Sequence, residues 1–222
     1  MINVIYWDGG NDKMSDTKIG RITLGICATN TYFLYKEDSK DIVVIDPADK
    51  GDFLYGKFNE KGFNVKAIIL THGHFDHIWG IELLKELSEA PVYASEDEKE
   101  LLKNVNENAS KMAGRPCTVK PDFLLKDNEE FELCGIKIKM IKTPGHTIGG
   151  CCYYIEDAGF LISGDTLFRE SVGRTDLPTG SMGTLVKSIK EKIMVLPDDT
   201  KVYPGHGPET TIGFEKENNP FL

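Results

Sequence analysis

The chain contains little histidine and cysteine, and it has no apolar run of membrane-spanning length. Its 222 residues include five histidines and five cysteines, and no two cysteines form a CxxC pair. An odd set of cysteines without a secretion signal argues against a disulfide framework, so we expect all five to be reduced packing residues. The N-terminus lacks the basic and apolar segments of a signal peptide, which predicts a cytoplasmic protein with no membrane partner.

Basic residues are also in short supply. Lysine and arginine total 26 against 35 aspartates and glutamates, which gives a formal net charge of -9 and a pI near 5.1. Nucleic-acid binding normally needs a basic surface, and the positive residues here are scattered, so we expect no nucleic-acid partner. No linker or repeat is visible, and the length suits a single domain spanning residues 1–222. The sequence does not indicate an oligomeric state.

Short apolar runs alternate with amphipathic stretches along the whole chain. The pattern predicts strands at residues 30–35, 41–46, 66–71, 91–95, 129–143 (a hairpin), 151–156 and 159–165, and a strand within 201–209 that ends in a Gly/Pro turn. Helical spacing appears at residues 79–89 and 181–196, and residues 96–121 give only a mixed helical and loop signal. Two strand-rich halves with flanking helices predict an α/β (α+β) fold in which two sheets pack face to face beneath outer helices.

Three of the five histidines lie in the segment THGHFDH at residues 71–77, directly after an apolar strand. If the chain stays extended through residue 76, its period of two places His72, His74 and Asp76 on one side. His77 can then point toward a second centre as the chain turns into a helix. The spacing predicts two adjacent metal sites, and the alternative is a group of ordinary surface or core histidines.

The other two histidines each follow a strand in a glycine-flanked turn: His146 in TPGHT and His206 in YPGHG. Glycine and proline let the backbone turn sharply there, which brings an imidazole to the edge of a sheet. Asp165, in ISGDT, ends another apolar strand, and a carboxylate can bridge two cations through its two oxygens. The alternative for Asp165 is a cap on the following turn.

Together these residues resemble the metal motifs of the metallo-β-lactamase superfamily. The resemblance implies an αββα sandwich with two metals at one edge of the sheets. It also implies a role for Asp46, in VVIDPAD, as a structural aspartate beneath the metal loop, whereas a simple turn-forming role is the alternative. In the implied ligand sets, Asp165 bridges the two metals. The first metal is held by His72, His74 and His146, and the second by Asp76, His77 and His206.

Residues 163–181, SGDTLFRESVGRTDLPTGS, are similar to the glyoxalase II and persulfide dioxygenase branch of that superfamily, and most to its short bacterial glyoxalase II-like hydrolases. The likeness implies that Arg174 binds a substrate carboxylate, and the alternative is a surface ion pair with Asp176. Asp176 stands where glyoxalase II has a tyrosine. Only 16 residues follow His206, which predicts that the helical substrate domain of glyoxalase II is absent.

The predicted function is a metal-dependent hydrolase that acts on a small thioester, such as an S-2-hydroxyacyl-glutathione or a related acyl-thiol. The cofactors expected are two divalent ions, zinc in the first place with iron or manganese as alternatives. A metal-bridging hydroxide would be the nucleophile and Asp76 would orient it, and no GxSxG motif offers a serine nucleophile. Two alternatives stay open: a persulfide dioxygenase with one iron on His72, His146 and Asp165, and a non-catalytic metal-binding protein.

Overall fold

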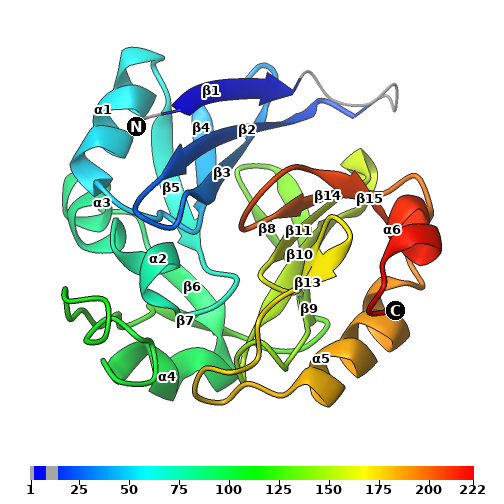
Figure 1. The fold of residues 1–222 in the computed structure, drawn as a ribbon. Helices are drawn as coiled ribbons and strands as arrows, with labels where there is room; N and C mark the ends of the chain where they lie inside the picture. The colour runs from blue at the N-terminus through cyan, green and yellow to red at the C-terminus, as the bar shows by residue number, and fades with distance from the viewer. Residues whose placement is uncertain (1–2, 9–14) are drawn as a thin grey trace.

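The computed structural model describes residues 3–8 and 15–222, and it shows two β-sheets packed face to face (Figure 1). Seven strands form the first sheet in the order of the chain, antiparallel from β1 to β4 and parallel from β4 to β7. These strands are β1 (Asn3–Asp8), β2 (Thr17–Leu24), β3 (Thr29–Lys36), β4 (Asp41–Ile45), β5 (Asn64–Ile69), β6 (Val92–Ser95) and β7 (Phe123–Leu125).

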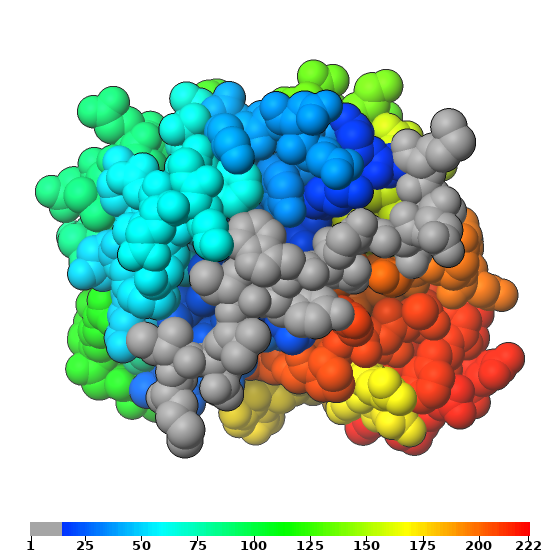
Figure 2. Space-filling model, turned by 90° about the horizontal axis from the view of Figure 1, so that it is seen from above, coloured from blue at the N-terminus to red at the C-terminus, as the bar shows by residue number. Residues whose placement is uncertain are grey.

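The second sheet has six strands in the order β15-β14-β11-β10-β9-β8. They are β8 (Glu130–Leu133), β9 (Ile136–Lys142), β10 (Cys151–Ile155), β11 (Phe160–Gly164), β14 (Lys201–Pro204) and β15 (Thr210–Thr211). A small separate ribbon consists of β12 (Leu167–Phe168) and β13 (Ser171–Val172). Viewed from above, the N-terminal half of the chain in blue and cyan packs against the C-terminal half in orange and red (Figure 2).

Helices cover the outer faces of both sheets (Figure 1). Those of the first half are α1 (Gly51–Glu60), α2 (Phe75–Ile78), α3 (Ile81–Ser88), the 3-10 turn η1 (Glu96–Glu98) and α4 (Lys99–Lys103). Those of the second half are the 3-10 turn η2 (Glu156–Ala158), α5 (Met182–Ser188), its π-helical continuation η3 (Ile189–Ile193) and α6 (Ile212–Asn218). In the described part of the chain, no helix is long and apolar enough to cross a membrane.

Three hydrophobic clusters define the layers, and the alternation of side chains along the strands produces them. In β4, Val43 packs between the two sheets, whereas its neighbour Val44 packs against α1 and α3. In β9, Met140 faces the space between the sheets, and Ile141 faces α5 and η3 on the far side. Each fully buried side chain of this kind contributes about 1.5–3 kcal/mol. The expected αββα sandwich is therefore confirmed.

The expected strands and the hairpin at 129–143 are present, but the conformation assumed for the histidine segment is wrong. Strand β5 ends at Ile69, and α2 begins at Phe75 with His74 in extended conformation at its N-cap. The chain is therefore not extended through residue 76. Asp76 and His77 are placed by the first turn of a helix, where consecutive side chains diverge by about 100°.

The expectation that every cysteine is a packing residue is also wrong for Cys27. All five cysteines have free thiols; Cys151 and Cys152 are buried, and Cys117 and Cys134 are half-buried. Cys27 is exposed because it lies in the turn between β2 and β3.

The helix expected at 79–89 begins only at Ile81, and helix α1 and strand β2 were not expected at all.

Candidate metal centre

The candidate ligands lie on loops that leave the sheets at one edge. Strand β11 is parallel to β14, and β9 runs in the same direction as β11 because β10 pairs antiparallel with both. The C-terminal ends of these three strands therefore meet at the same edge, and His146, Asp165 and His206 follow them. The loop after β5 in the first sheet brings the histidine segment to the same place. The topology thus unites donors that lie up to 134 residues apart, from His72 to His206.

The first group of donors consists of His72, His74 and His146, all buried. His74 Nδ1 lies 2.9 Å from His146 Nε2, which lies 3.3 Å from His72 Nε2. Ligand atoms around a tetrahedral zinc at about 2.0–2.1 Å are separated by roughly 3.3 Å, so these nitrogens suit a small transition-metal ion. The geometry fits three of the four positions of such a site and leaves one open.

The second group consists of Asp76, His77 and His206. Asp76 Oδ2 lies 3.3 Å from His206 Nε2 and 3.8 Å from His77 Nε2. The His77 side chain is 0% exposed, and its Nε2 has no hydrogen-bond partner. Since a buried polar atom normally has a partner, this nitrogen is accounted for if a cation binds there.

Asp165 lies between the two groups. Its Oδ1 is buried without a hydrogen-bond partner and faces His77 Nε2 at 3.4 Å. Its Oδ2 lies 3.4 Å from His206 Nε2 and 3.6 Å from His146 Nε2. A single carboxylate therefore faces donors of both groups, which is the arrangement that a bridging ligand requires.

Asp46 lies beneath the two groups and orients one histidine of each. Its Oδ2 accepts hydrogen bonds from His77 Nδ1 at 2.9 Å and from the Thr71 hydroxyl at 2.5 Å, and its Oδ1 accepts one from the Thr71 N–H. Thr71 Oγ1 is in turn 3.1 Å from His72 Nδ1. A carboxylate oxygen of Asp46 also lies within 4.8 Å of ligand atoms of both histidines, but both of its oxygens already accept these hydrogen bonds. The turn-forming alternative does not account for these bonds.

Backbone carbonyls orient two further histidines, His146 and His206, and sequence analysis had no means of finding these carbonyls. His146 donates from Nδ1 to the Arg174 carbonyl at 2.7 Å, and His206 donates from Nδ1 to the Cys27 carbonyl at 3.1 Å. Both Nε2 atoms are thereby left free to face the donor groups. The Thr29 hydroxyl also donates to Asp76 Oδ2 at 2.9 Å. These contacts join distant loops and leave no local pattern in the sequence.

The guanidinium of Arg174 is paired with Asp176 on the surface. Its Nε and Nη2 donate to the two carboxylate oxygens of Asp176 at 2.7 and 2.9 Å, and the Arg174 side chain is 62% exposed. The alternative surface ion pair is therefore present. An exposed pair of this kind is weak and exchanges easily with other partners.

The two groups differ in electrostatics. Burial holds the pKa of His72, His74 and His146 below the ordinary value, to about 3 for His74, so the first group consists of neutral imidazoles. Burial acts in the same direction on His206, but the hydrogen bonds that it donates to the Asp165 and Asp76 carboxylates outweigh burial and raise its pKa to about 9. The carboxylates likewise raise the pKa of His77 well above its usual value. The second group therefore holds protons where a cation would bind.

This difference predicts that metal binding releases protons from the second group only. At pH 7.5 a cation must displace protons from His206 and His77, whose pKa values are raised, whereas the first group has none to lose. Calorimetry in buffers of different ionisation enthalpy should show release of about one proton or more in a His146→Ala variant. That release should decrease as the pH rises through about 9, the pKa of His206. Equal release from a His206→Ala variant, which retains the first group, would contradict the assignment.

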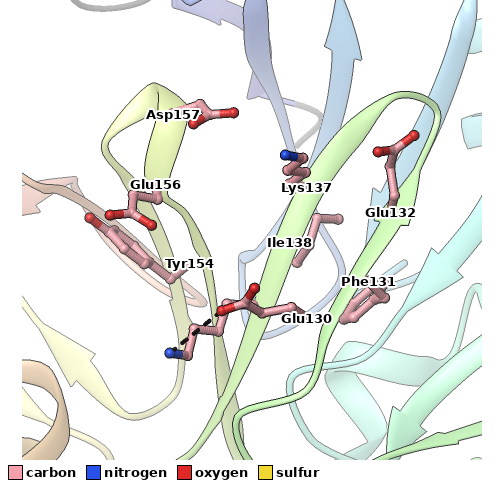
Figure 3. Close-up of a pocket in the computed structure, with 9 residues that line it drawn as sticks. Glu130, Phe131, Glu132, Lys137, Ile138, Tyr154, Glu156 and Asp157 are labelled. Atoms are coloured by element: carbon pink, nitrogen blue, oxygen red, sulfur yellow. Dashed lines mark ion pairs between the residues drawn. The ribbon is translucent and has the colours of Figure 1, made fainter.

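A hollow lies at the end of the second sheet that is opposite to the candidate metal ligands, and Figure 3 shows its lining. It has a volume of about 340 Å³ and is lined by β8, β9, β10 and η2. Glu130, Glu132, Glu156 and Asp157 surround it together with Lys137 and Lys139. It lies at the start of β9, whereas His146 follows the end of that strand. None of the candidate metal ligands lines it, so the centre and this hollow are separate.

Comparisons with known proteins agree with this geometry. The probable metallo-hydrolase YqgX of Bacillus subtilis is 40% identical over 204 residues, which cover 91% of this chain and 96% of that protein. Hydroxyacylglutathione hydrolase GloC of Haemophilus influenzae is 35% identical over 190 residues, which cover 84% of this chain and 89% of that protein.

Two solved structures have the same fold at similar identity. The crystal structure of BLEG-1 B3 metallo-beta-lactamase has a TM-score of 0.87 and 40% identity, covering 92% of this chain and 99% of that one. The crystal structure of TTHA1623 in a di-iron-bound form has a TM-score of 0.80 and 36% identity, covering 91% and 99%. The model of the metallo-beta-lactamase superfamily matches residues 24–206, which include every candidate ligand. This chain therefore belongs to the metallo-beta-lactamase superfamily, as its histidine and aspartate motifs predict.

Proposed function

We propose that this metallo-hydrolase cleaves a small thioester, such as an S-2-hydroxyacyl-glutathione or a related acyl-thiol. The observation that carries the proposal is the position of the Asp165 carboxylate between two complete donor groups. The 35% identity to a protein named hydroxyacylglutathione hydrolase supports the substrate class. A closed structural metal site uses four donors, so seven donors in two open groups favour a catalytic centre over a purely structural one.

In this proposal His72, His74 and His146 hold the first ion, Asp76, His77 and His206 hold the second, and Asp165 bridges them. Two divalent ions bound there would supply a water of lowered pKa and polarise the acyl carbonyl. The Thr29 hydroxyl keeps Asp76 Oδ2 in place, where this carboxylate would orient the nucleophile. The thiolate leaves readily because its conjugate thiol is fairly acidic.

The metal is proposed to be zinc, with iron or manganese as alternatives. Imidazole and carboxylate donors accept all three ions, so the donor chemistry alone does not select one. The di-iron form of the 36% identical protein supports iron as an alternative. A single-iron dioxygenase on His72, His146 and Asp165 would leave Asp76, His77 and His206 without a role, and it is the less favoured reading.

An assay of metal-defined protein on three substrates tests the proposal. The protein, loaded with zinc, iron or manganese, is given an acyl-glutathione thioester, glutathione persulfide with oxygen uptake recorded, and a chromogenic cephalosporin. The last substrate is included because BLEG-1, whose crystal structure is 40% identical, is named a B3 metallo-beta-lactamase. Thioester cleavage without oxygen uptake is expected. Oxygen uptake on the persulfide, or β-lactam cleavage alone, would refute the proposed substrate class.

We expect Arg174→Ala to raise the KM for an anionic acyl-thiol by roughly tenfold, since a charge-assisted hydrogen bond to the substrate carboxylate is lost. The pair with Asp176 must open to allow this contact, and its exposure makes that easy. Asp176→Ala is the matched control, because it frees the guanidinium and should leave the KM equal or lower. Equal losses in both variants, or on a neutral thioester, would show that the pair only supports the loop.

A further inference from the structure

A buried carboxylate outside both donor groups joins the two loops that carry the first group. Glu98 is 1% exposed and lies at the end of η1, directly before α4. Its Oε1 accepts a hydrogen bond from the Gly73 N–H at 2.9 Å. Its Oε2 accepts one from the Gly149 N–H at 2.7 Å.

The two glycines lie in loops that follow strands of different sheets. Gly73 lies between His72 and His74, in the loop after β5 of the first sheet. Gly149 lies three residues after His146, in the loop after β9 of the second sheet. One side chain therefore spans the boundary between the sheets at the point where the three histidines of the first group must meet.

Both positions allow the close approach that these bonds need. A Cβ on Gly149 would lie 2.3 Å from the Glu98 backbone nitrogen, and one on Gly73 would lie 2.7 Å from a methyl carbon of Leu101. A larger residue at Gly149 would push the backbone that carries Glu98 away from the loops, whereas one at Gly73 would displace the end of the Leu101 side chain of α4. The backbone is therefore packed tightly around this carboxylate.

We propose that Glu98 is a positioning residue for the first metal: it sets the distance between His146 and the His72–His74 pair by holding both loops on one carboxylate. The inference rests on the proposed function, because it needs a metal at the first group. Glu98 touches neither the ion nor the substrate, and it acts through Gly73 and Gly149.

The chemistry of the carboxylate makes the role testable with an isosteric change. Only a carboxylate offers acceptors at both oxygens, so it satisfies both N–H groups at once. Glu98→Gln has the same shape, but it places an amide NH2 against one of the two N–H donors. One loop must then shift, or a buried donor is left unpaired. Glu98→Asp keeps the charge but is one methylene shorter, so it should hold the two loops together less well than Glu98 and better than Glu98→Gln.

The experiment measures metal affinity at each group separately. In a His206→Ala background, where the first group alone is complete, Glu98→Gln should raise the dissociation constant for zinc by about 10- to 100-fold, the range for outer partners of metal ligands. The visible bands of cobalt(II) bound there should change as well, and Glu98→Asp should fall between. Glu100→Gln, the same change at an exposed position of α4, is the matched control.

A second background separates positioning from general stability. In His146→Ala, where the second group is complete, Glu98→Gln should leave zinc affinity unchanged. Equal losses at both groups, or a first group that binds zinc as in Glu100→Gln, would overturn the proposal. If Glu98→Gln does not fold, zinc affinity is compared in the same two backgrounds with Glu98→Asp, and the same outcomes would overturn the proposal. Because hydrolysis is not the readout, a chain that binds metal but cleaves no thioester refutes only the proposed substrate.

Discussion

Asp76→Ala is expected to lower kcat for thioester hydrolysis by about 100-fold or more while changing KM far less. Asp76 is proposed to hold the second ion and to aim the nucleophile, so its loss removes stabilisation that exists mainly in the transition state. The structure also restricts the position of the Asp76 carboxylate. Asp76 Oδ2 accepts a hydrogen bond from the Thr29 hydroxyl at 2.9 Å and faces His206 Nε2 at 3.3 Å, so the side chain has little conformational freedom.

Two further variants make the Asp76 result interpretable. Asp76→Asn keeps the shape but not the charge, and it should be nearly as inactive as the alanine variant. Asp52→Ala, at an exposed aspartate of α1, should behave like the unchanged protein. Rates are expressed per bound metal, so that loss of the ion is separated from loss of orientation. Hydrolysis that survives Asp76→Ala within about threefold would show that the proposed role is wrong.

The metal content should fall stepwise when either group is broken. Elemental analysis of the unchanged, metal-replete protein is expected to give about two ions per chain, one for each complete group. His146→Ala and His206→Ala should each retain about one ion, because each variant leaves the other group intact. Asp165→Ala should weaken both sites, since its oxygens face His77 on one side and His146 and His206 on the other.

A content of one ion per chain, unchanged by His77→Ala or His206→Ala, would contradict the dinuclear centre. That outcome would favour the single-iron alternative on His72, His146 and Asp165. Glu100→Gln serves as the control here too, since it alters an exposed carboxylate on α4 that belongs to neither donor group. Its metal content should equal that of the unchanged protein.

The sequence was informative wherever a local pattern has a chemical meaning. Strand alternation predicted both sheets, and three histidines in seven residues predicted a metal centre. Sequence failed where the backbone changed conformation within the motif. An extended chain through residue 76 was a reasonable extrapolation of period two, yet the chain turns into α2 at Phe75. The spacing of donors along a chain does not reveal whether a strand or a helical turn presents them.

By itself, the sequence determined which side chains are available to bind metal, many of the strands in both sheets, and that the chain has a superfamily motif. Only the tertiary structure decided how these parts meet. It placed Asp165 between the two groups, directed Arg174 toward Asp176, and put Glu98 between loops of different sheets. The physical reason is that periodicity acts over a few neighbouring residues. The orientation of a histidine, in contrast, depends on hydrogen bonds from loops that only sheet packing brings together.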